Sequence, residues 1–254
     1  MTMSMADLLR FDPMEQLEAD MKEVIEHAVF NSSRSLQKEL GPSEVGHPCP
    51  RRIAFGLMGF PKVAARFDCL PSAVGTAAHD FFGKAFESAN ARTGEDRWLV
   101  EDRVNPFLDT EGNSDLFDTR TKTVVDDKFL SKEKVQHARK HGPRKVYRNQ
   151  VQSYALGFVR KGYDVENVGI WFLPRGGLLA DAFFWHEPFD PSIGEWVGTR
   201  LATIAALVYD LDLDNHPERA QMVPADTSDC SFCDWQTKFP VATPHCIPAN
   251  EKAQ

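Results

Sequence analysis

Two acids and a lysine stand directly after an apolar pair in the segment TVVDDKF, residues 123–129. Side chains alternate between the two faces of a strand, so Asp126 and Lys128 are expected to point one way and Asp127 the other. An unpaired carboxylate in a protein core costs several kcal/mol, and such groups are normally paired, solvated or bound to a cation. The segment therefore indicates either a solvated surface hairpin or a cation site.

A second acid is expected close to this segment. The segments DLFDT (115–119) and KTVVDDKFL (122–130) flank a polar turn around Arg120, which predicts an antiparallel hairpin that brings Asp115 near Asp126. Two adjacent carboxylates repel each other unless a divalent cation lies between them. Mg²⁺ or Mn²⁺ would suit these oxygen ligands and would activate water for phosphate ester hydrolysis, with Lys128 beside the water or the phosphate.

The elements that must position these residues predict a mixed α/β fold, in which helices flank a mixed central sheet. We expect a short helix that starts at Cys49, and Ser72 is placed to cap a later one. The polar stretch 131–148 is expected to be a surface loop or a short helix. Helical periodicity marks residues 14–30, 71–91, 149–162 and 193–211, and strand patterns mark 97–104, 115–119, 122–130, 167–174 and 177–185.

Length and composition predict one large domain. The chain has 254 residues, of which 42% are hydrophobic, enough to bury a full core. We divide it into a helical extension (1–45), a core (46–216) and a cysteine-rich segment (217–254). The net charge of -8 argues against non-specific coating of nucleic acid, although a local basic patch can still bind a phosphate backbone. No apolar run approaches a membrane span and the start lacks a signal-peptide pattern, so we expect a cytoplasmic protein with no membrane partner.

Several residues occur in an order that resembles the PD-(D/E)XK nuclease superfamily, specifically its RecB-like exonuclease branch. They are His79 in GTAAHDFF, Asp115 in GNSD, Asp126 and Lys128 in VVDDK, and Gln150 and Tyr154 in NQVQSY. The resemblance implies a restriction-endonuclease-like core in which His79, Asp115 and Asp126 bind the metal, with the backbone carbonyl of Asp127 as a further ligand. It also implies that Lys128 orients water or phosphate.

Gln150 and Tyr154 are one helical turn apart and share a face; by the resemblance they support the site and the bound strand. Gln152 competes with Gln150, and Asp127 competes with Asp126. The register that provides D-x-K and Q-x-x-x-Y together selects Asp126 and Gln150. Each residue alone has a simpler interpretation, such as a packed core histidine for His79.

The cysteines indicate a soft-metal site. Cys230 and Cys233 form C-x-x-C and Cys246 follows, while the fourth ligand has to come from Cys49 or Cys69. Disulfides are not expected in a chain without an export signal. Zinc also suits four thiolates, and His245 is an alternative ligand to Cys246.

A subset of RecB-like nucleases, including AddB and the CRISPR-associated exonucleases of the Cas-four type, has one cysteine before the nuclease motifs and three in a C-terminal group. This resemblance implies a [4Fe-4S] cluster on Cys49, Cys230, Cys233 and Cys246, with Cys69 as a free thiol. Twelve residues separate Cys233 from Cys246, which is longer than the family spacing. The cluster would join the two ends of the core as a staple.

The basic stretch 131–148 is the expected DNA contact. It has seven lysines or arginines against one glutamate, although a solvated loop is the alternative. The candidate DNA-binding residues are Lys132, Lys134, Arg139, Lys140, Arg144, Lys145 and Arg148, with Arg51 and Arg52 beside the first cluster cysteine.

These expectations together describe an Mg²⁺- or Mn²⁺-dependent deoxyribonuclease. We expect it to act as an exonuclease on DNA ends or single strands. The family roles are recombination, repair or end processing in a bacterial or phage setting, with a nuclease or recombination complex as partner. One alternative is a catalytically inactive DNA-binding subunit of the same fold, and another is a zinc-stapled structural protein.

Overall fold

The computed structural model describes residues 13–31, 40–63, 68–107, 110–228, 230, 233–237 and 244–246. Its centre is a mixed sheet of five strands in the order β1-β2-β3-β4-β5, which confirms the expected mixed α/β class. The pair β3–β4 is parallel and the other neighbours are antiparallel. The strands are β1 (Trp98–Phe107), β2 (Thr110–Asp118), β3 (Thr123–Leu130), β4 (Asn167–Pro174) and β5 (Phe183–Pro188).

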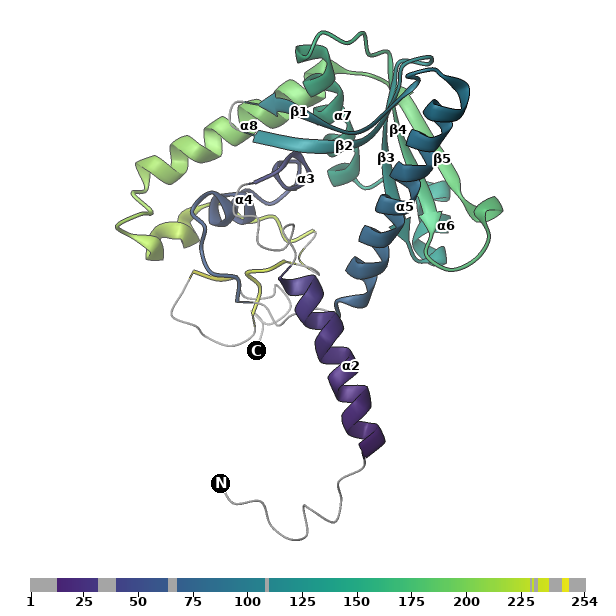
Figure 1. Ribbon diagram of the computed structural model, residues 1–254. Coiled ribbons are helices and arrows are strands. Elements are labelled where there is room, and N and C mark those ends of the chain that lie inside the picture. The colour runs from purple at the N-terminus through teal and green to yellow at the C-terminus, as the bar shows by residue number, and fades with distance from the viewer. Residues whose placement is uncertain are drawn as a thin grey trace.

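Helices lie on both faces of this sheet (Figure 1). The helix α5 packs on β1, β2 and β3, α7 packs on the opposite face against β1, β3 and β4, and α2 projects from the body (Figure 1). The helices are α2 (Pro13–Phe30), α3 (Pro42–Val45), α4 (Pro50–Leu57), α5 (Leu70–Thr93), α6 (Lys132–His141), α7 (Lys145–Arg160) and α8 (Pro191–Asp210), with 3₁₀ turns η1 (Leu179–Asp181) and η2 (Pro217–Met222).

The strand β3 is buried along most of its length because both of its faces are covered. Parallel strands need a crossover connection, and α6 and α7 supply it between β3 and β4. On the α7 side, Phe117 of β2 stacks on Phe158 of α7, with ring centroids 4.8 Å apart. On the α5 side, Phe82 packs edge-on against Phe129 and Trp171. The charged residues of β3 are consequently carried into the interior.

Three local expectations are wrong. The helix α5 starts at Leu70, with Cys69 at the N-cap position, so Ser72 does not cap it. The stretch 177–185 is a strand only from Phe183, because residues 179–181 form a 3₁₀ turn after Gly177, whose φ is 128°. The stretch 131–148 contains the expected short helix at residues 132–141, but the next helix, α7, begins at residue 145 and not at 149.

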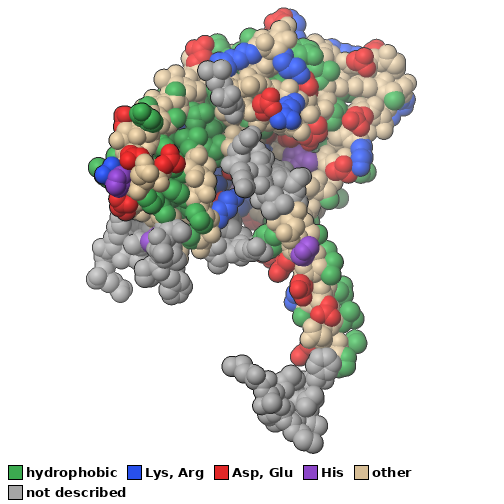
Figure 2. Space-filling view, turned by 60° about the vertical axis from the view of Figure 1, so that its left-hand side comes forward, with side chains coloured by type: hydrophobic (Ala, Val, Ile, Leu, Met, Phe, Trp, Pro, Cys, Tyr) green, Lys and Arg blue, Asp and Glu red, His purple; other side chains and the backbone are tan. Residues whose placement is uncertain are grey.

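The helix α5 buries less than its apolar pattern suggests. It has no fully buried residue, and the side chain of Phe81 is 69% exposed. The projecting helix α2 likewise shows apolar side chains to solvent (Figure 2). None of the described helices combines the length and the apolar character that a membrane crossing requires. The first twelve residues, where we expect no signal peptide, lie outside the described residues.

We expect Gly157→Ala to destabilise the fold by about 1–3 kcal/mol, because it overpacks the contact between α7 and β1. A Cβ at Gly157 would lie 2.8 Å from Cβ of Val104 and 3.3 Å from the backbone nitrogen of Pro106. That clash outweighs the gain in helix propensity of about 1 kcal/mol. Gly75→Ala in α5 is the matched control, since nothing lies within 4 Å of its Cβ position. Urea unfolding should show a loss for the first variant and a small gain for the second; two equal gains would contradict the packing argument.

Candidate active site

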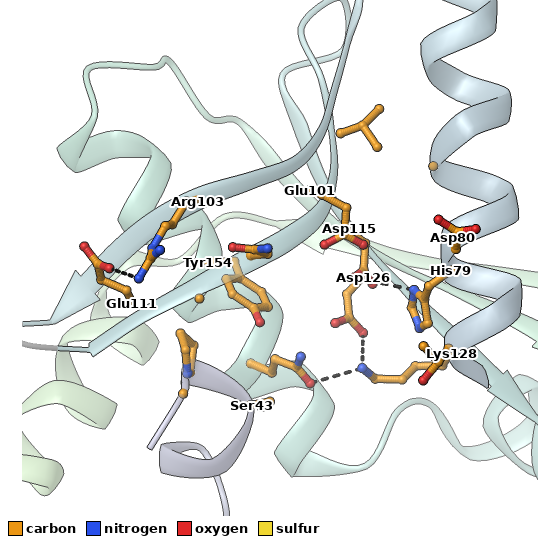
Figure 3. A pocket seen from close by; sticks show the side chains of 18 of the residues that line it. Ser43, His79, Asp80, Glu101, Arg103, Glu111, Asp115, Asp126, Lys128 and Tyr154 are labelled. Carbon is orange, nitrogen blue, oxygen red and sulfur yellow. Dashed lines mark hydrogen bonds and ion pairs between the residues drawn. The ribbon is translucent and has the colours of Figure 1, made fainter. Parts of the chain in front are cut away.

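A cavity of about 900 Å³ opens where β1, β2 and β3 meet α3, α5 and α7 (Figure 3). It collects side chains that are far apart in the sequence. Six residues expected at the site line it: His79, Asp115, Asp126, Lys128, Gln150 and Tyr154. The combination of the β2–β3 hairpin with one helix on each face therefore brings the whole ordered set to one place.

Asp126 and Lys128 form a buried ion pair on β3. Oδ2 of Asp126 lies 2.7 Å from Nζ of Lys128, and Asp126 is only 1% exposed. Nζ of Lys128 also donates to Oε1 of Gln150 at 3.1 Å and lies over the ring of Tyr147. Because α7 supplies Gln150 and Tyr147, the packing of this helix decides where the ammonium group points.

Asp115 connects β2 to the two neighbouring elements. Its Oδ1 lies 3.6 Å from Nδ1 of His79, and its Oδ2 accepts the backbone N–H of Asp127 at 2.7 Å. The ring of His79 packs edge-on against Phe129, with centroids 5.0 Å apart. These contacts hold the histidine of α5 against the acidic hairpin.

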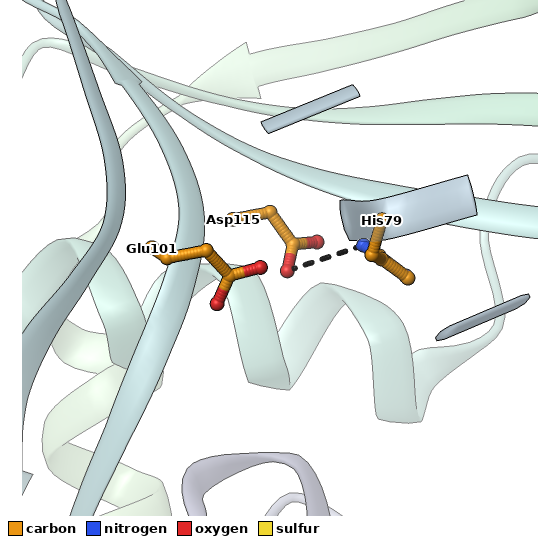
Figure 4. Close-up of side chains that lie close together, drawn as sticks. All are labelled: His79, Glu101 and Asp115. Carbon is orange, nitrogen blue, oxygen red and sulfur yellow. Dashed lines mark ion pairs between the residues drawn. The ribbon is translucent and has the colours of Figure 1, made fainter. Parts of the chain in front are cut away.

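Glu101 of β1 also lines this cavity, and it is not among the residues predicted from the sequence. One ligand atom each of His79, Glu101 and Asp115 lies within 4.8 Å of the other two (Figure 4). Asp126 is outside this group of three because it faces Lys128 (Figure 3). The alternating pattern of WLVED predicts the strand β1, but strand alternation does not indicate that Glu101 turns toward Asp115, because its φ is 48°.

Burial dominates the protonation of the acids in β3. The pKa of Asp126 is raised to about 6, chiefly by desolvation and also by Asp115, while Lys128 opposes the rise. Desolvation likewise raises the pKa of Asp127 to about 8, with contributions from Asp115, Asp126 and Glu101. Burial alone would lower the pKa of Lys128, but the neighbouring carboxylates raise it on balance. The site thus holds more negative charge than Lys128 neutralises.

The competing residues lie elsewhere. The amide of Gln152 donates to Oε1 of Glu187 at 2.8 Å, and its Oε1 accepts the backbone N–H of Asp190, so it braces α7 against the end of β5. The side chain of Asp127 does not line the cavity. Its Oδ1 has no hydrogen-bond partner among the described residues, although Asp127 is only 4% exposed.

The structure does not bring the basic stretch to the cavity. Lys132 pairs with Asp181 at 3.1 Å, and Arg148 pairs with Glu187 at 2.7 Å. Arg139 donates to the carbonyls of Asp181 and Ala182. Several of these basic side chains therefore bind acids and carbonyl groups near β5, on the flank of the molecule. The lysines and arginines that do line the cavity are Lys84, Arg103 and Lys128.

The other basic candidates are also absent from the cavity lining. Arg144 lies over the ring of Tyr147, and Lys145 lies over that of Trp196. Nε of Arg51 donates to the carbonyl of Val223 at 2.8 Å. The remaining candidates, Arg52, Lys134 and Lys140, do not line the cavity either.

Four of the five cysteines gather around α4. Cys49 precedes this helix, and Cys233 and Cys246 pack in the core that joins α4 to η2 and the C-terminal segment. Burial raises the pKa of Cys230, and the thiols of Cys233, Cys49 and Cys246 raise it further. In the described part of the chain, no three thiols bring their sulfur atoms within 4.8 Å of one another.

Arginines neighbour these thiols. Nη1 of Arg51 lies 4.0 Å from Sγ of Cys246. Burial raises the pKa of Cys246 and of Cys233, and Arg51 and Arg52, respectively, oppose that rise. The arginines that the sequence analysis assigned to DNA therefore lie beside the thiols. A guanidinium favours the thiolate form, which is the form that binds metals.

No protein-family model and no curated protein matches the chain. Among solved structures it is similar to an alkaline exonuclease, LHK-Exo, from Laribacter hongkongensis, with 12% identity, a TM-score of 0.48, and coverage of 79% of this chain and 98% of that one. The complex of LHK-Exo with dAMP also matches, at 12% identity and a TM-score of 0.48, covering 73% of this chain and 95% of that one. A phage-related exonuclease from Haemophilus somnus 129PT matches at 16% identity and a TM-score of 0.38, covering 70% and 96%.

Proposed function

We propose that this protein is a metal-dependent deoxyribonuclease that hydrolyses phosphodiester bonds at DNA ends or in single strands. The observation that carries the proposal is the convergence of His79, Asp115, Asp126 and Lys128 in one cavity, in the chain order of the PD-(D/E)XK motifs. A surface hairpin with solvated charges would not bury Asp126 to 1% exposure.

The donor set fits a divalent cation. Carboxylates and one imidazole are suitable ligands for Mn²⁺ and, through the oxygens, for Mg²⁺. Oδ1 of Asp127 is buried without a hydrogen-bond partner among the described residues, and both Asp115 and Asp126 act on this carboxyl group. His79, Asp115 and Asp126 would hold the ion, with the backbone carbonyl of Asp127 as a further ligand. A bound ion would supply a water of lowered pKa and stabilise negative charge on a phosphate.

The chain's own residues would then orient the reacting groups. Lys128 is fixed between Asp126 and Gln150, so its ammonium is positioned to hold a phosphate oxygen or the attacking water. Gln150 keeps that ammonium in place from α7, and Tyr154 forms the neighbouring wall of the cavity. Arg103 of β1 pairs with Glu111 at the rim, where a phosphate of the bound strand could replace the glutamate.

The direct test is a time course on end-labelled single- and double-stranded oligonucleotides with Mg²⁺, with Mn²⁺ or with EDTA. We expect metal-dependent shortening from an end. A protein that binds the oligonucleotides but leaves them intact with either metal would be the binding subunit instead. A protein that neither binds nor cleaves DNA would overturn the proposal.

We further propose that Cys49, Cys230, Cys233 and Cys246 hold a [4Fe-4S] cluster with a structural role. The mutual effect of these thiols on the pKa of Cys230 and the two adjacent arginines support a common thiolate site. Sulfur ligands of one zinc ion lie about 3.8 Å apart, since Zn–S bonds are about 2.3 Å, whereas a cluster distributes its ligands over several irons. No three sulfur atoms of the described thiols lie within 4.8 Å of one another, so the cluster is proposed over zinc on the resemblance of the cysteine order.

We expect anaerobically purified protein to be brown and to contain iron and sulfide. Cys49→Ser should lose the colour and unfold at a lower temperature, because the link between α4 and the C-terminal segment is removed. Cys69→Ser is the matched control; Cys69 is also buried, at the N-cap of α5, and should tolerate serine with the colour retained. Colourless protein that contains zinc would identify the rival metal, and protein with neither metal would refute the site.

A further inference from the structure

Glu101 has an unusual backbone for a strand residue. Its φ is 48°, in the left-handed region that side chains other than glycine rarely adopt. Leu99 and Val104, five positions apart, both pack on the core beneath α7, whereas strict alternation would place them on opposite faces. The strand thus changes face between these two residues. This change directs Glu101 to the cavity, on the level of Asp115 in the neighbouring strand (Figure 3).

The distances between three possible ligand atoms are compatible with the binding of one metal ion. The ligand atoms of His79, Glu101 and Asp115 all lie within 4.8 Å of one another. Two ligands on opposite sides of one Mg²⁺ ion are about 4.2 Å apart, and on one Ca²⁺ ion about 5 Å apart, from their usual bond lengths. Small side-chain rotations would therefore bring all three atoms onto one ion. Glu101 is exposed and Asp115 and His79 are half-buried, so the position is open to solvent on one side.

The carboxylates that surround Glu101 also favour a bound cation at this position. The carboxylates of Glu101, Asp115, Asp126 and Asp127 act on one another, and Lys128 is the ammonium among them. Asp127 does not line the cavity, but Asp115 and Glu101 both act on its buried carboxyl group, whose Oδ1 has no hydrogen-bond partner among the described residues. Carboxylates held as close as those of Glu101 and Asp115 repel each other unless a divalent cation lies between them.

We propose that Glu101 is a further metal-binding residue, which completes with His79 and Asp115 the coordination of a divalent cation on the α5 side of the cavity. The inference rests on the proposed metal-dependent activity, and it adds a ligand that none of the recognised motifs contains. The imidazole favours Mn²⁺ over Mg²⁺ at this position, because Mg²⁺ prefers oxygen ligands alone. The strained backbone of Glu101 is then the cost of presenting its carboxylate to the ion.

The test is Mn²⁺ binding to the full chain without DNA, measured by calorimetry and by the loss of the free-ion electron paramagnetic resonance signal. Glu101→Gln should weaken binding by about 10-fold or more, the size seen when metal-site residues are lost. Glu87→Gln is the matched control; Glu87 lies on the α5 wall of the same cavity, outside the group of three, and its loss removes the same charge. It should bind within about twofold of the parent.

Glu101→Asn separates a ligand from a structural role. Asparagine adopts the left-handed conformation more readily than glutamate, so this variant should melt at a higher temperature than the parent while it binds Mn²⁺ more weakly. A lower melting temperature together with weaker binding in both Glu101 variants would assign Glu101 a structural role and overturn the proposal.

The outcomes separate the two proposals. Mn²⁺ binding by Glu101→Gln equal to that of the parent, or an equal loss in Glu87→Gln, overturns the role of Glu101 and leaves the nuclease proposal standing. A parent that binds Mn²⁺ through Glu101 but never cleaves DNA supports the ligand and refutes the nuclease. A parent that binds no Mn²⁺ overturns both.

Discussion

Asp126→Asn is expected to reduce DNA cleavage by at least about 10³-fold, because it removes a buried metal ligand and an interaction worth several kcal/mol in the transition state. The amide has nearly the same shape, and Gln150 still accepts from Lys128, so the fold should be retained. The measurement is the initial rate on end-labelled DNA with Mn²⁺, together with a circular dichroism spectrum of each protein.

The control for this change is Asp164→Asn, which removes the same charge from a surface pair with Lys122, where the side chain of Asp164 is 74% exposed. It should cleave at the parent rate, since exposed ion pairs contribute little. Equal rates for the parent and Asp126→Asn would remove Asp126 from the catalytic machinery. Equal DNA affinity with no cleavage by either protein would instead favour the inactive binding subunit.

The metal-free protein is expected to lose stability as the pH rises from about 4 to about 8, by up to a few kcal/mol. The pKa of Asp126 is raised to about 6 and that of Asp127 to about 8, both from 3.8. The folded state therefore keeps protons that the unfolded chain has already released, so the free energy of unfolding falls as these folded-state groups ionise. Asp118, whose pKa is lowered to about 2, acts with the opposite sign and below this range.

Urea unfolding in EDTA at pH 5 and pH 8 measures this effect. Asp127→Asn should flatten the pH dependence and be more stable than the parent at pH 8, because a neutral amide needs no proton to be buried. Asp164→Asn should keep the parent slope. Mn²⁺ should stabilise the parent more at pH 8 than at pH 5, when the carboxylates are free to bind it. A parent whose stability rises over this range would contradict the assignment of buried, protonated carboxylates.

Local pattern was sufficient for the acidic hairpin and for most elements of the fold. The strand 122–130 differs by one residue at its start from β3, and the hairpin with β2 forms because two alternating segments flank a short polar turn. Gln150 and Lys128 meet because the helical repeat places Gln150 on the inner face of α7, one turn before Tyr154. These features depend on neighbours within a few residues, which the sequence displays directly.

The basic stretch shows what local pattern leaves open. Its high positive charge predicts a surface for DNA, and only the structure shows that Lys132, Arg139 and Arg148 contact groups near β5 that lie far along the chain. Composition counts charges and does not show which acid lies opposite each one. The exposed Phe81 of α5 has the same cause, since periodicity identifies an apolar face but not the element that covers it.

The sequence by itself determined the acid-x-lysine strand, its hairpin partner and the mixed α/β class, because strand and helix periods are local properties of the chain. Only the tertiary structure decided that Glu101 faces His79 and Asp115, since a positive φ in β1 and the docking of α5 set that contact. The residues alone left Cys49 and Cys69 as alternative partners of the C-terminal thiols, and core packing between segments about 180 residues apart in the chain brings Cys49 near them.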